Sequence, residues 1–163
     1  MIKDAKFSDC GKYRFWLKRI WDEELPQLQL IGLNPSTANA ETDDPTIRRV
    51  AGTADRNWLN GLAAANGYGG IWMTNLFPFI TAYPSELRTD DIGISLNDFV
   101  LRATAIYCRD VCFCWGNFDV LGRDKVVMEM FPDALCFGKN KNGSPKHPLY
   151  LKSTTELIKY TQP

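Results

Sequence analysis

The stretch LQLIGLNPSTANAETDDPTIRR, residues 28–49, decides the predicted fold and the place of the candidate site. It begins with an apolar run of the length of a buried strand, and this run stops at Gly32. Asn34 and Pro35 are poor strand residues, because proline lacks the amide hydrogen that a sheet requires and restricts the residue before it. A polar loop therefore follows the carboxyl end of a strand. In open α/β sheets this is where ligands bind.

The composition predicts one ordinary globular domain over residues 1–163, with 45% hydrophobic and 23% charged residues. Nineteen basic residues balance nineteen acidic ones, so we expect no large nonspecific nucleic-acid surface. The sequence carries no signal for an oligomeric state. It contains no apolar stretch long enough to span a bilayer and no secretory signal, so we expect a cytoplasmic protein without membrane contact.

The five cysteines are odd in number and lack the paired spacing of a metal site. We interpret them as small buried hydrophobic residues in a reducing compartment, and we expect no metal and no cofactor. A catalytic cysteine is disfavoured, because its usual partner is a histidine and the chain has one histidine, His147, far along the sequence.

Short apolar runs alternate with helical patterns along the chain. We expect strands over residues 27–33, 71–77, 111–115 and 135–137. We expect helices over residues 45–65, 95–107 and 117–130. In the first helix Gly52 and Gly61 also permit a break into two shorter helices. This order predicts a three-layer α/β/α fold with a mostly parallel four-stranded sheet and right-handed crossovers.

Residues 12–21, KYRFWLKRIW, alternate imperfectly between bulky apolar and cationic side chains. The pattern favours an edge strand or hairpin arm that packs on one side. The alternative is an aromatic and basic platform for nucleic acid.

Three polar segments follow predicted strands and carry the candidate residues. Asn34 follows the first strand, Asn75 lies near the end of the second ahead of Pro78, and the loop at residues 138–151 after the last strand contains His147. Because carboxyl ends of parallel strands share one edge of a sheet, we expect the two amides and the imidazole to line one crevice.

The chemistry of these side chains suits a nucleobase. An asparagine presents a donor and an acceptor that match the amide-like edge of a base, which assigns Asn75 to base recognition. His147 can donate to an oxygen on which negative charge accumulates as a base leaves, and Asn34 can orient a water. The alternatives are a turn residue at Asn34, an amide that satisfies loop backbone at Asn75 and a surface histidine.

Charged residues lie near the expected mouth of the crevice. Asp43 and Asp44 fit helix capping. Arg48 and Arg49 fall in the first turn of a helix, where cations are unfavourable with the helix dipole, so we expect at least one to bind a carboxylate or phosphate.

The blocks GLNPSTA, DDPTIRR, TNLF, WG and KHPLYL together resemble a bacterial and phage family, the domain of unknown function 1643, over residues 13–151. The chain is also similar to the uracil-DNA glycosylase superfamily. The similarity rests on Gly32-Leu33-Asn34-Pro35, on Asn75, on His147-Pro148 and on the run ADRNWLNGLAAANGY. This resemblance implies a uracil-DNA-glycosylase-like fold, a water-positioning first motif, a base-reading asparagine and a histidine that stabilises the leaving base. Ser36 and Leu149-Tyr150 depart from the superfamily's pattern.

We therefore expect a glycosylase-like hydrolase acting on the N-glycosidic bond of a nucleobase in DNA or a nucleotide, with Asn34 and His147 as catalytic residues. A base in duplex DNA would have to be flipped out. The alternatives are a non-catalytic nucleotide or modified-base binding protein and a serine hydrolase using Ser36. The expected substrate-binding residues are Gly32, Leu33, Pro35, Ser36, Thr37, Asp44, Arg48, Arg49, Asn75, Lys146 and Pro148.

Overall fold

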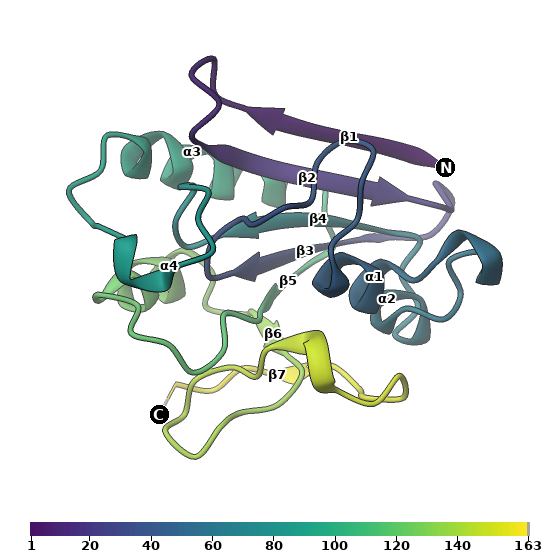
Figure 1. Ribbon diagram of the computed structural model, residues 1–163. Helices are drawn as coiled ribbons and strands as arrows, with labels where there is room; N and C mark the ends of the chain where they lie inside the picture. Colours follow the sequence, from purple (N-terminus) through teal and green to yellow (C-terminus); the bar gives the residue numbers. More distant parts are fainter. Residues whose placement is uncertain (163) are drawn as a thin grey trace.

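A seven-stranded sheet forms the centre of the computed structural model, which describes residues 1–162 (Figure 1). The strand order across the sheet is β1-β2-β4-β3-β5-β6-β7. β1 forms one edge and the short β7 the other (Figure 1). The strands are β1 (Ile2–Phe7), β2 (Arg14–Ile20), β3 (Gln27–Gly32), β4 (Gly70–Asn75), β5 (Asp110–Phe113), β6 (Leu135–Cys136) and β7 (Ile158–Lys159).

The sheet is mixed, which corrects the expectation of a mostly parallel four-stranded sheet. β3 pairs in parallel with β4 and with β5, and β5 pairs in parallel with β6. The pairs β1/β2, β2/β4 and β6/β7 are antiparallel. The sequence did not predict β1 because its residues IKDAKF are largely polar and exposed, and it did not predict β7 because two exposed residues carry no periodicity.

β2 is a hairpin arm rather than an edge strand. It lies between β1 and β4, and β1 takes the edge position. β2 still alternates as the sequence predicts, since Phe15, Leu17 and Arg19 are buried while Trp16 and Lys18 are half-buried.

Helices cover both faces of the sheet. On one face α1 (Pro45–Ala51) and α2 (Leu62–Ala65) pack on apolar side chains that include Leu28 and Leu30. On the other face α3 (Gly93–Ala105) and α4 (Arg123–Met130) pack on a second cluster that includes Ile31. Successive strand residues point to opposite faces, so β3 contributes to both cores.

The predicted helix over residues 45–65 is broken into two, the second of the two arrangements that the sequence allowed. Gly52 ends α1 with a φ of 91°, a conformation that favours glycine. At Gly61 a Cβ would stand 2.5 Å from the carbonyl carbon of Ala51, so only glycine permits this close approach. A short 3₁₀ helix, Ala54–Arg56, lies between the two helices.

Two other features bear on function. Over residues 1–162 none of the helices combines the length and the apolar character that crossing a bilayer requires. Cys112, Cys114 and Cys136 are buried as expected, whereas Cys10 is exposed and Cys108 is partly exposed.

Candidate functional site

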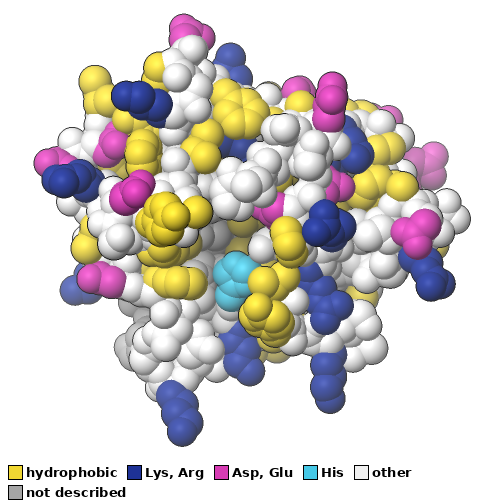
Figure 2. All heavy atoms as spheres, in the orientation of Figure 1, with side chains coloured by type: hydrophobic (Ala, Val, Ile, Leu, Met, Phe, Trp, Pro, Cys, Tyr) yellow, Lys and Arg dark blue, Asp and Glu magenta, His cyan; other side chains and the backbone are white. Residues whose placement is uncertain are grey.

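A cavity of about 190 Å³, lined by both polar and apolar side chains, opens where β3 and β4 end. Figure 2 shows the imidazole of the chain's one histidine at a hollow in this face of the molecule. The cavity is lined by Arg14, Gly32, Leu33, Asn34, Ser36, Asp44, Thr46, Ile47, Met73, Asn75, Thr81, Ala82, Pro84, Phe118 and His147.

Gly32 and Asn75 form the part of the cavity that the sheet provides. They are register partners at the ends of the parallel strands β3 and β4. A Cβ at position 32 would stand 2.9 Å from Asn75 Oδ1 and 2.5 Å from Met73 Cε. Glycine at this position therefore leaves the space that the Asn75 carboxamide occupies.

Asn75 is 1% exposed, and neither Oδ1 nor Nδ2 has a hydrogen-bond partner. Among residues 1–162 it is the only buried amide side chain with both polar atoms unpartnered. Buried amides normally find partners, because an unpaired polar group costs about 1–3 kcal/mol. The Asn75 carboxamide therefore borders the cavity with one donor and one acceptor that no group of residues 1–162 satisfies.

Asn34 connects the end of β3 to the loop that follows β4. Its Nδ2 donates to the Thr81 carbonyl at 2.8 Å and to the Pro35 carbonyl at 3.0 Å. Its Oδ1 accepts no hydrogen bond from residues 1–162 and is not among the buried unpartnered atoms. The amide nitrogen is therefore structural, while the amide oxygen of this cavity-lining residue remains without a partner among residues 1–162.

His147 is held by the turn that it caps. Its Nδ1 accepts from the Leu149 amide at 3.2 Å, at the start of the 3₁₀ helix Pro148–Tyr150. Burial lowers the pKa of His147, and the nearby Asp44 carboxylate opposes this shift. A neutral imidazole with Nδ1 as acceptor carries its proton on Nε2, so His147 is a hydrogen-bond donor at neutral pH.

The Asp44 carboxylate accepts hydrogen bonds from two other residues. Its Oδ1 accepts from the Ile47 amide at 2.8 Å and so caps α1, and its Oδ2 accepts from Ser36 Oγ at 3.1 Å. Ser36 thus donates to the aspartate and has no hydrogen bond to His147. The serine–histidine contact that a hydrolase triad needs is not present between these residues.

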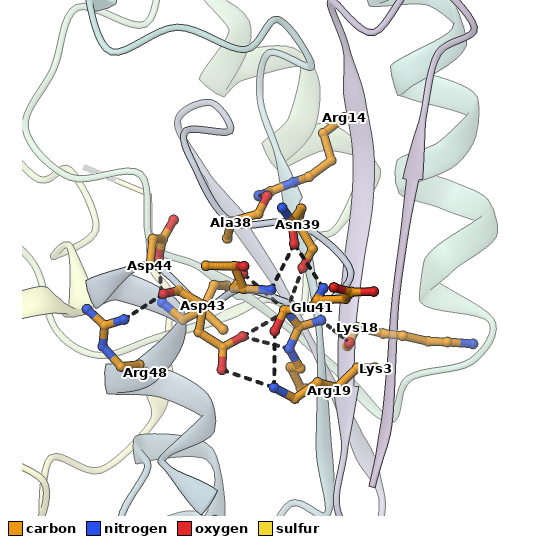
Figure 3. Close-up of polar contacts among 12 residues, drawn as sticks. Lys3, Arg14, Lys18, Arg19, Ala38, Asn39, Glu41, Asp43, Asp44 and Arg48 are labelled. Atoms are coloured by element: carbon orange, nitrogen blue, oxygen red, sulfur yellow. Dashed lines mark hydrogen bonds and ion pairs between the residues drawn. The ribbon is translucent and has the colours of Figure 1, made fainter.

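The loop that carries Asp44 is fixed by a buried ion pair next to it (Figure 3). Arg19 is fully buried and donates from Nε to Asp43 Oδ1 at 2.8 Å and from Nη2 to the Asn39 carbonyl at 2.6 Å. These bonds tie the loop between β3 and α1 to β2. They hold Asp44 at the cavity, since it follows Asp43 directly.

Arg14 is a lining residue that the sequence analysis did not predict. It is 2% exposed, it donates from Nη1 to the Ala38 carbonyl at 2.8 Å, and its buried Nε has no partner. The sequence placed it among the cations of an alternating strand, where charged side chains are expected to face solvent. No pattern in a single strand distinguishes a buried cation from an exposed one.

The structure brings together seven of the predicted site residues: Gly32, Leu33, Asn34, Ser36, Asp44, Asn75 and His147. Six others do not line the cavity: Pro35, Thr37, Arg48, Arg49, Lys146 and Pro148.

The expected role of Arg48 and Arg49 as ligands of a substrate phosphate is not supported by their positions. Arg48 donates to the Asp43 carbonyl at 2.6 Å, and Arg49 donates to the Leu151 carbonyl. Both arginines therefore bind backbone around α1. The expectation of an unfavourable first-turn position was wrong, because α1 ends at Ala51 and both arginines lie in its last turn, where the helix dipole favours cations.

The fold and the cavity define a mixed α/β protein with a cavity, lined by both polar and apolar side chains, at the carboxyl ends of its central strands. Within this class the chain belongs to the family described as Protein of unknown function (DUF1643), whose sequence profile matches residues 14–149. No curated protein and no solved structure matches the chain.

Proposed function

We propose that this protein hydrolyses the N-glycosidic bond of a nucleobase bound in the cavity at Asn34, Asn75 and His147. The observation that carries the proposal is the Asn75 carboxamide, which is buried in the cavity with both polar atoms free. A nucleobase edge that offers one acceptor and one donor side by side would satisfy both atoms.

The reaction requires a water that attacks the sugar and a group that stabilises the departing base. The free Oδ1 of Asn34 can accept a hydrogen bond from that water and orient it. As the C1′–N bond breaks, its electron pair goes to the base, the water oxygen bonds to C1′, and the proton that the water loses neutralises the departing base anion. The Nε2 proton of neutral His147 can donate to the base oxygen on which negative charge develops.

We also propose that the fold is that of the uracil-DNA glycosylase superfamily. Supporting this, Asn34 and Pro35 follow β3, Asn75 ends the neighbouring parallel strand β4, and His147 follows β6. These are the positions at which the resemblance to that superfamily places its three motifs.

Release of free base tests the function. Purified protein is incubated with nucleosides, nucleoside monophosphates and oligonucleotides that contain uracil or modified bases, and the released base is measured by chromatography. Asn34→Ala and His147→Ala should each lower the rate about 100-fold, the usual effect of removing a positioned hydrogen bond from a reacting group. Lys146→Ala, an exposed residue outside the cavity, serves as the matched control. Release that is unchanged in both cavity variants contradicts the proposal.

A second candidate function is binding of a nucleotide or modified base without cleavage. One observation favours it: both Asp44 oxygens accept hydrogen bonds from the chain, so the cavity's carboxylate is already engaged. Saturable binding of a substrate that remains intact through long incubation would select this alternative.

A further inference from the structure

Three arginines are almost fully buried in residues 1–162, and two of them have a carboxylate partner. Arg19 pairs with Asp43 at 2.7 Å, and Arg123 pairs with Asp98 at 2.5 Å. Arg14, which is 2% exposed, forms no ion pair. It is also the only one of the three that lines the cavity.

The charge on Arg14 has no ion-pair partner within residues 1–162, and the Asp44 carboxylate in the same cavity only partly offsets the effect of burial on the pKa of the guanidinium. Burial lowers the pKa of the guanidinium to about 10, so it remains a cation at neutral pH. Its Nη1 donates to the Ala38 carbonyl, and its Nε, although buried, has no acceptor. Asp44 lines the same cavity, but it lies beyond ion-pair distance, and its oxygens accept from Ile47 and Ser36. A buried unpaired cation is unfavourable unless an anion binds beside it.

We propose that Arg14 binds the terminal phosphate of a nucleoside monophosphate, so that the substrate of the cavity is a free nucleotide. This inference rests on the proposed function, since it assigns the base to Asn75 and His147. The base and sugar of such a ligand carry no formal charge, which leaves the phosphate as the group that a guanidinium would bind. The planar fork of arginine donors fits phosphate oxygens better than the point charge of a lysine.

The burial of Arg14 favours a terminal phosphate over a phosphate within a strand. An internal phosphate joins two sugars, so a polynucleotide strand continues on both sides of it. Both parts of the strand would have to pass close to Arg14, a side chain that is only 2% exposed. A terminal monoester can approach a buried group from one side. In Figure 2 Lys and Arg side chains gather below the histidine with few Asp or Glu among them. This distribution attracts an anionic ligand to the mouth of the cavity.

Calorimetric titration with matched pairs of nucleosides and their 5′-monophosphates tests the inference. The wild-type protein should bind at least one monophosphate about tenfold or more tightly than its nucleoside, as expected for one charge-assisted contact. In Arg14→Gln this preference should disappear while nucleoside binding persists, and Arg14→Lys should retain part of it. Arg48→Gln, which removes an exposed arginine outside the cavity, should keep the full preference.

A second measurement guards against misfolding of the Arg14 variants. Inorganic phosphate, compared with chloride at equal ionic strength, should raise the melting temperature of the wild-type protein and of Arg48→Gln but not of Arg14→Gln. Equal affinity for nucleosides and monophosphates overturns the inference, as does a preference that survives in Arg14→Gln. If a single-stranded oligonucleotide binds in an Arg14-dependent way and no monophosphate binds, the substrate is not a free nucleotide and the inference is overturned.

The outcomes separate this inference from the proposed function. Phosphate preference without release of base from any substrate leaves the inference standing as a binding site and rejects hydrolysis. Release of base without phosphate preference rejects the inference alone. If no pair binds and inorganic phosphate gives no thermal shift, the inference is rejected, and the proposed function is rejected as well only if no substrate, oligonucleotides included, releases its base.

Discussion

The Oδ1 atom of Asn75 would lie 2.9 Å from a Cβ at position 32, although Gly32 and Asn75 belong to different strands. The two residues are paired in register at the carboxyl ends of β3 and β4. The missing side chain of one residue therefore makes room for the carboxamide of the other. This complementarity places an amide with two unpartnered atoms inside the cavity.

Gly32→Ala should reduce ligand binding and stability together. The new methyl group would also stand 2.5 Å from Met73 Cε, the flexible end of a side chain that can move, whereas the Asn75 carboxamide has less freedom. Crowding of this kind typically costs about 1–3 kcal/mol. Urea unfolding should report that loss, and titration with nucleotides should report weaker binding. An unchanged affinity would show that Asn75 does not depend on the space at position 32.

Asn75→Leu should stabilise the protein while abolishing its binding of ligand. The substitution replaces a buried amide that has no partners by an apolar side chain of similar size, so the free energy of unfolding should rise by about 1 kcal/mol or more. Asn97→Leu is the matched control. Asn97 is equally buried, but its Nδ2 donates to the carbonyls of Asn75 and Leu76, so its loss should destabilise the fold. A destabilised Asn75→Leu protein would indicate a structural amide.

The sequence predicts the middle of the sheet and the amides at its end, because apolar runs that stop at Asn34-Pro35 or ahead of Pro78 mark the ends of buried strands. It does not predict Arg14, because a cation in an alternating strand gives no sign of which face is covered. The expectation for Arg48 and Arg49 failed because it assumed one helix over residues 45–65, whereas α1 ends at Ala51 and both arginines lie in its last turn, where cations are favourable. The burial of Arg14 depends on its contact with Ala38, which is distant in the sequence, and the position of the two arginines depends on where α1 ends.

Asp43→Asn should destabilise the protein by about 3–5 kcal/mol, because it removes the carboxylate partner of the fully buried Arg19. The loop between β3 and α1 should also loosen, since Arg19 joins it to β2. Chemical denaturation measures the first effect and hydrogen exchange of residues 36–44 the second. Asp55→Asn provides the control, because the Asp55–Arg56 pair is largely exposed and should contribute less than about 1 kcal/mol. Similar effects of both substitutions would contradict the assigned role of Arg19.

His147 should make the free energy of unfolding decrease as pH falls below the usual pKa of histidine. Burial lowers the pKa of His147 in the folded chain below the usual histidine value of 6.5. Between the two pKa values the unfolded chain therefore binds more protons than the folded chain, so stability rises with pH in that window. The contribution is complete above pH 6.5 and is lost as pH falls through the lower, folded pKa.

His147→Asn isolates this effect. Asparagine keeps an acceptor for the Leu149 amide but does not titrate, and His147 is the only histidine of the chain. The unfolding free energy is measured for both proteins from pH 7.5 to pH 5. As pH falls, the unfolding free energy of the wild type should decrease more than that of the variant. Parallel pH profiles would mean that the imidazole is as free to take up a proton in the folded chain as in the unfolded one. His147 would then not be held as the neutral Nε2 donor that the proposed reaction needs at the departing base.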